Sequence, residues 1–181
     1  MTAERQAGRD ALSVLLQHRF ARPALLREAL THPSTDPQAR GGASFGYERL
    51  EFLGDRVLGL VVAEWLLERF PDEPEGALSR RHTDLVRRET LAEIARGIEL
   101  GRHLILSAGE AEYGGRENEA ILADGCEAVI AALYLDGGLE AARRFVRSAF
   151  AEVIDRHRRP PLDAKTALQE WVQARGLPLP D

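Results

Sequence analysis

Clustered carboxylates are the feature of this sequence with the clearest chemical meaning. Glu48, Glu51 and Asp55 lie at positions i, i+3 and i+7, so a helix would place them within about 60° of one another on one face. Two like charges about 4 Å apart repel each other by roughly 4 kcal/mol at an effective dielectric constant near 20. A positive group must therefore offset this repulsion, and either the adjacent Arg49 and Arg56 or a divalent metal ion would do so.

A second pair of acids repeats this pattern later in the chain. Asp124 and Glu127 lie at i and i+3 in the most apolar helical segment, where carboxylates are unfavourable unless they are paired or bind a cation. Two helices that each present acids on one face predict a site for a hard metal with oxygen ligands, namely Mg²⁺ or Mn²⁺. A di-iron helical bundle would need Glu-x-x-His motifs, and none of the five histidines has Glu three residues before it.

The simplest alternative is that the first acidic stripe is an ordinary solvated helix face. Gly54 lies inside that stripe and argues against this alternative, because glycine within a helix costs about 1 kcal/mol relative to alanine. Glycine is favoured where another backbone or a ligand approaches closely, and Gly125 lies between the second pair of acids. Both acidic segments are therefore expected to be approached closely by a helix or a ligand.

Helical periodicity predicts the elements that position these acids. Apolar residues recur at steps of three and four, and no segment shows the two-residue alternation of a β-strand, so the sequence predicts an all-α fold. Loops are predicted over residues 34–46 and 107–116. Helices are predicted over residues 4–19, 23–30, 47–70, 77–98 (one bent helix or two), 119–135, 139–157 after a Gly137–Gly138 break, and 163–175.

Length and composition limit the class of protein. The 181 residues, of which 44% are hydrophobic, suit one domain with a short appendage. The longest apolar runs have seven and eight residues, against the roughly 20 that a membrane-spanning helix needs, so no membrane span is expected. The N-terminus shows no secretory signal, and Cys126 is the only cysteine, which excludes an internal disulfide and fits a cytoplasmic protein.

The net charge of −5 argues by itself against a nucleic-acid-binding protein, because such proteins usually carry a basic surplus. A carboxylate metal site also biases the total charge toward the acidic side. The distribution of charge therefore carries more information than the sum.

The acidic segments resemble those of a known family. The stretch Glu48–Asp55, which reads Glu-Arg-Leu-Glu-Phe-Leu-Gly-Asp, is similar to the signature motif of the ribonuclease III family, and Asp124-x-x-Glu127 follows it as in that family. The resemblance covers nearly the whole chain. Shorter matches lie at Ala29–His32, Arg69–Pro71, Glu75–Gly76, Leu85–Val86, Thr90–Ala92 and Ile121–Ala128.

The resemblance implies an all-α endonuclease domain over residues 1–159 that acts as a homodimer. It implies hydrolysis of double-stranded RNA with Mg²⁺, or Mn²⁺ as a substitute, which leaves 5′-phosphate and 3′-hydroxyl ends. The biological role would be the processing of ribosomal and other structured RNA precursors in the cytoplasm. Residues 160–181 resemble a linker and the first helix of a truncated double-stranded-RNA-binding domain, in which Thr166 and Gln169 would contact RNA.

The resemblance also assigns roles to the acids. By the family pattern, the metal ligands are Glu51, Asp55, Asp124 and Glu127, and Asp55 and Glu127 among them are catalytic. Two further acids fall where the family carries acids that line the RNA valley, and these are Glu48 and Glu75.

Two other functions remain as alternatives. A non-cutting RNA-binding relative of the same fold would typically lose Asp55 or Glu127, and both are present. A small-molecule phosphohydrolase would usually add histidine ligands, but His82 and His103 are not spaced as a pair near either acidic segment. Phe52 and Leu53, beside the acidic stripe, would leave apolar bulk at an open valley, so we expect a two-fold partner to cover them.

Overall fold

The computed structural model describes residues 12–35, 46–156, 172 and 175. Within these ranges the chain is helical and has no β-strand, and Thr31 and Ile105 form one isolated bridge. The all-α prediction is therefore confirmed. No helix in the described part of the chain is long and apolar enough to span a membrane. The helices are α2 (Pro23–Ala29), the 3₁₀ turn η1 (Pro33–Thr35), α3 (Glu48–Arg69), α4 (Glu75–Val86), α5 (Arg88–Gly97), α6 (Leu100–His103), α7 (Ala108–Glu112), α8 (Glu119–Ala149) and α9 (Ala151–Ile154).

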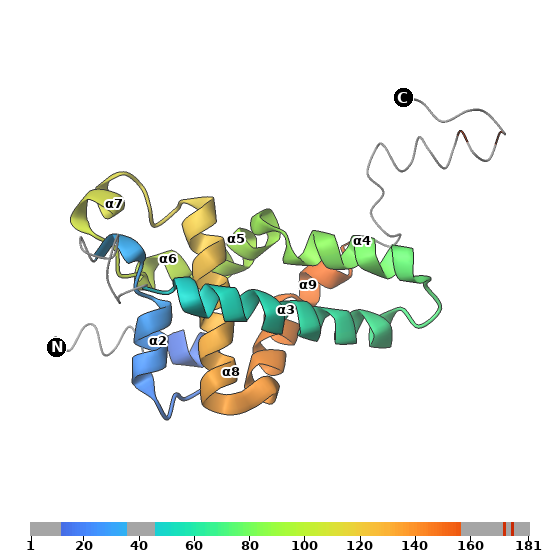
Figure 1. The fold of residues 1–181 in the computed structure, drawn as a ribbon, viewed down its shortest axis with the longest axis horizontal. Coiled ribbons are helices and arrows are strands. Elements are labelled where there is room, and N and C mark those ends of the chain that lie inside the picture. The colour runs from blue at the N-terminus through green and yellow to red at the C-terminus, as the bar shows by residue number, and fades with distance from the viewer. Residues whose placement is uncertain (1–11, 36–45, 157–171, 173–174, 176–181) are drawn as a thin grey trace.

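The long helices α3 and α8 form the centre of the fold, and they cross each other (Figure 1). Leu58, Val61 and Val62 of α3 are fully buried, and so are residues 128–133 of α8. A helix that is apolar all round must be enclosed, and α2, α3 and α5 pack around α8. The core therefore fixes the relative positions of the two helices that carry the acidic segments.

The segment predicted over residues 77–98 as one bent helix or two forms two helices, α4 and α5. Arg87 has an extended backbone (φ −68°, ψ 157°) that separates α4 from α5. The imidazole Nε2 of His82 lies 3.0 Å from the carbonyl oxygen of Gly59, which joins α4 to α3. The buried Arg81 side chain donates two hydrogen bonds of 2.7 Å to the Glu73 carboxylate. The contact of His82 holds α4 beside α3, and the contact of Arg81 ties α4 to the turn that precedes it. Helix α4 runs back along α3 (Figure 1).

Helix α8 bends at the glycine pair predicted to interrupt it. Gly138 has φ 72° and ψ −177°, a conformation that glycine adopts without strain from a side chain. Beside the bend, the Asp136 carboxylate accepts hydrogen bonds from the backbone N–H groups of Ala21 (2.9 Å) and Arg22 (2.8 Å). The same carboxylate lies 2.8 Å from the His18 ring. The bend therefore anchors the N-terminal segment of the described chain.

The segment predicted as a loop over residues 107–116 contains the short helix α7, so that prediction is wrong for residues 108–112. The Ser107 hydroxyl accepts a hydrogen bond from the Glu110 backbone N–H at 3.2 Å. Serine followed three residues later by glutamate is a known helix-start signal. The predicted helix 163–175, with Thr166 and Gln169, and residues 36–45 fall outside the part of the chain that is described.

Candidate active site

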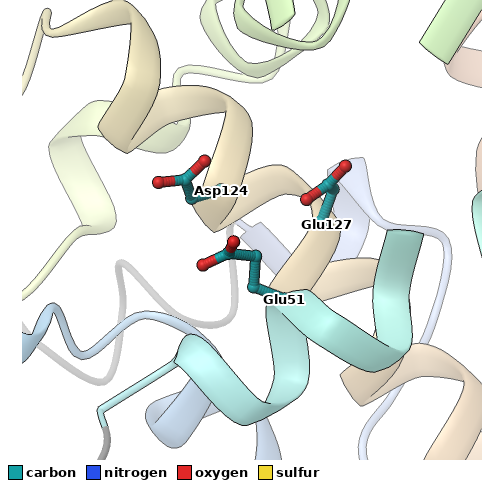
Figure 2. A group of neighbouring side chains, drawn as sticks. All are labelled: Glu51, Asp124 and Glu127. Carbon is teal, nitrogen blue, oxygen red and sulfur yellow. The ribbon is translucent and has the colours of Figure 1, made fainter. Parts of the chain in front are cut away.

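Three carboxylates from two helices converge where α3 crosses α8. Oxygen atoms of Glu51, Asp124 and Glu127 lie within 4.8 Å of one another. Figure 2 shows Glu51 reaching from α3 toward Asp124 and Glu127 on α8. The side chains are half-buried, so they are neither fully solvated nor closed off from a ligand. We call this group the acidic cluster.

Close packing of the two helices at Gly54 creates the acidic cluster. A Cβ atom at Gly54 would lie 1.9 Å from the backbone carbonyl oxygen of Glu127, so only glycine allows α3 to approach α8 this closely. The expectation of a close approach at Gly54 is confirmed, and the approaching group is a helix backbone. Gly125 faces a different neighbour, because a Cβ atom there would lie 3.3 Å from the side chain of Leu104, at the end of α6 (Leu100–His103).

Burial raises the pKa values of the three carboxylates of the acidic cluster, and for Glu51 and Glu127 the charges of neighbouring acids add to this shift. Burial, together with the charges of Asp55, Glu51 and Asp124, raises the pKa of Glu127 to about 8. Burial and the charges of Asp124, Glu48 and Asp55 raise the pKa of Glu51. Burial also raises the pKa of Asp124, although Arg88 and His32 oppose this shift. The protein therefore holds the cluster without enough positive charge to neutralise it.

The other predicted acids take different positions. The Asp55 carboxylate is ion-paired with the adjacent Arg56 guanidinium and does not join the three converging oxygens, although its charge acts on Glu127. Glu48 is exposed and acts electrostatically on Glu51. Glu75 begins α4, beyond the far end of α3. At 1.5 Å per residue, the helix from Glu51 to Arg69 spans about 27 Å, so one chain does not bring Glu75 to the cluster.

Residues to which the sequence patterns assigned no role in the site lie near the cluster. The buried Tyr47 ring packs edge-on against His32, with 5.5 Å between ring centroids. The Ser34 backbone N–H donates to His32 Nδ1 at 3.0 Å, which fixes the imidazole orientation. Burial lowers the pKa of His32 despite the nearby charge of Glu110. The charge of Glu110 also acts on Tyr47. Nothing in the local spacing of Glu110 predicted this position, because only the tertiary fold brings α7 near His32.

A divalent cation fits the residues of the acidic cluster. Its donors are carboxylate oxygens, which are the ligands that hard divalent metals prefer. A bound cation would also offset the mutual repulsion that raises the pKa values of Glu51 and Glu127. The absence of histidine and cysteine from this group of possible ligands disfavours a zinc site.

Comparison with known proteins gives consistent matches. A family profile described as Ribonuclease-III-like matches residues 22–154. The chain is 49% identical over 178 residues to Ribonuclease 3 of Rhodopseudomonas palustris, covering 98% of this chain and 65% of that protein. It is 53% identical over 163 residues to Ribonuclease 3 of Dinoroseobacter shibae, covering 90% of this chain and 69% of that protein. The chain thus spans about two thirds of the length of these relatives.

Solved structures show the same fold. The crystal structure of the nuclease domain of ribonuclease III from Campylobacter jejuni matches with a TM-score of 0.72 and 36% identity, covering 85% of this chain and 97% of that one. A second structure of that nuclease domain, described as flexible in a region involved in dimer formation, matches with a TM-score of 0.70 and 39% identity. It covers 78% of this chain and 97% of the other.

Proposed function

Because the chain belongs to the ribonuclease III-like family, we propose that it is a metal-dependent endoribonuclease that hydrolyses double-stranded RNA. The observation that carries this proposal is the convergence of Glu51, Asp124 and Glu127 at the α3–α8 crossing. The family resemblance was expected from the motif Glu48–Asp55, and the profile match confirms it. The proposed role is the processing of ribosomal and other structured RNA precursors in the cytoplasm.

The acids would have separate roles in the reaction. Glu51, Asp124 and Glu127 would hold Mg²⁺, with Mn²⁺ as a substitute. When bound, the metal supplies Lewis-acid chemistry that activates water for attack on phosphorus and stabilises negative charge on the leaving oxygen. Asp55, which lies close enough to act on Glu127, would leave Arg56 and complete the ligand set. Glu48, at the exposed edge of the cluster, would line the RNA valley.

Cleavage of matched RNAs tests this function. The protein is incubated with one long RNA duplex and with one of its single strands, each with Mg²⁺ or EDTA, and the products are separated on a denaturing gel. We expect cleavage of the duplex alone, dependent on Mg²⁺, with 5′-phosphate and 3′-hydroxyl ends. Binding of the duplex without cleavage at any divalent metal concentration would favour the non-cutting alternative.

We also propose that the enzyme is a homodimer whose interface includes the outer face of α3. Phe52, Leu60 and Leu67 lie along that helix, and their side chains are 66%, 58% and 64% exposed. Arg56 lies over the Phe52 ring, 4.4 Å from its centroid. Three large apolar side chains on one helix face are unusual for a monomer surface. A two-fold partner would cover them and set two acidic clusters beside one valley.

Light scattering tests the proposed assembly. The parent protein should have about 40 kDa, twice the chain mass of 20.0 kDa, and the Phe52→Asp variant should have the mass of one chain and little activity. Tyr113→Asp is the matched control, because Tyr113 is 93% exposed on the loop after α7 and should leave the dimer intact. A parent protein that is monomeric at micromolar concentration would refute the homodimer.

A further inference from the structure

His32 and Tyr47 are two neutral polar side chains that lie beside the acidic cluster and that the roles of the acids leave unused. Tyr47 directly precedes α3 and has a helical backbone (φ −83°, ψ −6°). Its carbonyl oxygen accepts a hydrogen bond of 2.9 Å from the backbone N–H of Glu51. Side chains four residues apart on a helix are neighbours on one face. The Tyr47 side chain therefore lies on the face of α3 that carries Glu51.

The orientation of the His32 ring is fixed by its neighbours. The backbone N–H of Ser34 donates a hydrogen bond of 3.0 Å to Nδ1, so the neutral ring carries its proton on Nε2. The Tyr47 ring packs edge-on against the imidazole, and the Tyr47 backbone N–H donates to the Thr31 carbonyl oxygen at 3.0 Å. Nε2 forms no hydrogen bond within the described part of the chain. The Nε2–H group is therefore an oriented donor that is available to a further acceptor.

Backbone contacts set the place of this donor independently of the acidic cluster. The His32 backbone N–H donates to the Ile105 carbonyl oxygen at 2.9 Å, and the Thr35 hydroxyl donates to the His32 carbonyl oxygen at 2.9 Å. A Cβ atom at Gly46 would lie 2.8 Å from the Thr31 carbonyl oxygen, so the chain that enters α3 packs directly on the segment that holds His32. A donor held in this way loses little conformational entropy when it binds an acceptor.

Asp124 is the member of the acidic cluster whose charge acts on both donors. Burial raises the pKa of the Tyr47 phenol, and Asp124 is the acid that adds most to this shift. Burial lowers the pKa of His32, and Glu110 and Asp124 are the acids that most oppose this shift. Both side chains are therefore neutral donors near pH 7. The Asp124 carboxylate accepts no direct hydrogen bond from either of them within the described residues, so a water molecule would span the remaining gap.

We propose that His32 and Tyr47 are positioning residues that orient the Asp124 carboxylate for the metal through one shared water molecule. The water accepts hydrogen bonds from the His32 Nε2–H group and the Tyr47 hydroxyl, and it donates one to Asp124. This inference rests on the proposed function and adds the groups that hold one of its metal ligands. Carboxylate ligands of metals are themselves usually hydrogen-bonded. Because both donors are neutral, they orient Asp124 without supplying a positive charge that would compete with the metal.

Mn²⁺ binding in the absence of RNA tests this role without depending on cleavage. Free Mn²⁺ is measured by electron paramagnetic resonance as each protein is titrated. Tyr47→Phe removes only the hydroxyl group and keeps the buried ring, so it should weaken Mn²⁺ binding by about tenfold, as for other groups that hold a metal ligand. Its melting temperature in EDTA should match that of the parent. Tyr134→Phe is the matched control, because Tyr134 lies on α8 about two turns beyond Glu127 and is 37% exposed.

Two substitutions of His32 separate its contact with Ser34 from the proposed one. His32→Asn introduces an Oδ1 atom that can accept the Ser34 N–H, but its amide does not extend to the Nε2 position, so Mn²⁺ binding should weaken by about tenfold. His32→Gln extends an amide N–H toward that position and should recover most of the affinity. The double variant Tyr47→Phe/His32→Asn should bind little more weakly than either single variant, because both donors hold one water molecule. His103→Asn is the control, since His103 is a half-buried histidine of α6 on which no acid of the cluster acts.

Cleavage separates this inference from the proposed function. At saturating Mg²⁺, Tyr47→Phe should cleave duplex RNA at a rate within about threefold of the parent, because its defect lies in metal affinity. If the parent cleaves duplex RNA but Tyr47→Phe and His32→Asn bind Mn²⁺ as tightly as it does, the positioning role is wrong and the function stands. If the parent neither cleaves duplex RNA nor binds Mn²⁺ more tightly than Glu127→Gln does, the proposed function itself fails.

Discussion

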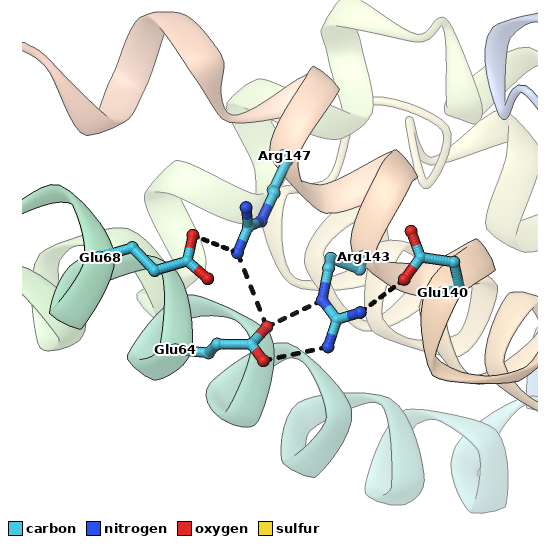
Figure 3. Close-up of polar contacts among 5 residues, drawn as sticks. All are labelled: Glu64, Glu68, Glu140, Arg143 and Arg147. Carbon is cyan, nitrogen blue, oxygen red and sulfur yellow. Dashed lines mark hydrogen bonds and ion pairs between the residues drawn. The ribbon is translucent and has the colours of Figure 1, made fainter.

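The two ends of the region where α3 and α8 pack together hold carboxylates in opposite ways. At one end, the acidic cluster brings Glu51, Asp124 and Glu127 together without a matching cation. At the other end, Glu64 and Glu68 of α3 face arginines of α8 (Figure 3). The Arg143 guanidinium lies 2.8 Å from Glu64, and Arg147 lies 2.7 Å from Glu68 and 3.6 Å from Glu64. We call this second group the arginine network.

The pKa values of the carboxylates shift in opposite directions in the arginine network and in the acidic cluster. A hydrogen bond from Arg147 lowers the pKa of Glu68, whereas burial and neighbouring acids raise the pKa of Glu127 to about 8. The arginine network pairs Glu64 and Glu68 of α3 with arginines of α8 and so joins the two helices. The acidic cluster lacks a positive partner, which a metal ion would provide. Under the proposed function, the same helix pair therefore supports stability at one end and would support a metal-dependent reaction at the other.

The largest effect is expected from Glu127→Gln. The amide keeps the shape of the side chain but loses the anionic oxygen that a hard metal requires, so cleavage should fall by more than about 100-fold while duplex binding persists. Glu64→Gln is the matched control, because it makes the same change in the arginine network and should cleave normally. The measurement is single-turnover cleavage, and a rate for Glu127→Gln within threefold of the parent would remove Glu127 from the site.

A smaller effect on activity and a clear loss of stability are expected from Gly54→Ala. The added methyl group would lie 1.9 Å from the Glu127 carbonyl oxygen, so α3 and α8 must separate and misplace the acidic cluster. Overpacking of this kind typically costs about 1–3 kcal/mol. Urea unfolding measures the loss, and Gly97→Ala is the control because a Cβ atom there would have no neighbour within 4 Å. Equal stability of the two variants would show that Gly54 does not set the helix spacing.

Sequence patterns predicted the parts of the site that depend on local spacing. Asp124 and Glu127 share a helix face because they are three residues apart, and the periodicity of α3 placed Glu51 on one face. The pairing of Asp55 with Arg56 depends on side-chain conformations, which spacing does not determine. The position of Glu75 depends on how α4 packs against α3, which is a tertiary property. The catalytic and metal-binding roles themselves stay predictions.

Metal-free protein should lose stability as pH rises, in contrast to the usual behaviour of paired carboxylates. The pKa of Glu127 is about 8 in the folded state, against an ordinary value of 4.5. The folded state therefore retains a proton that the unfolded state releases, and this contribution is lost progressively between about pH 4.5 and 8. After solvent screening, a remaining penalty of about 1 kcal/mol corresponds to about 2–4 °C in melting temperature at this chain length.

Melting in EDTA across this pH range measures the effect. Glu127→Gln should melt above the parent at pH 8 and show a flatter pH dependence, because the amide cannot ionise. Added Mg²⁺ should raise the parent's melting temperature more at pH 8 than at pH 6, since metal and proton compete for the same oxygens. An equal Mg²⁺ shift at both pH values would show that Glu127 does not release a proton on binding metal.

The smallest effect is expected from Arg143→Ala in the arginine network. The guanidinium contacts both Glu64 and Glu140, but all three side chains are partly exposed, and ion pairs of this kind contribute about 1 kcal/mol or less. Urea unfolding at low salt should show a loss of this size, and 1 M NaCl should reduce the difference because the Debye length falls to about 3 Å. The Mg²⁺ concentration that gives half-maximal cleavage should not change, because the acidic cluster lies at the other end of the α3–α8 contact. A shift in that concentration would mean that the two ends are coupled through the helices, and the division between a structural and a reactive end would then be wrong.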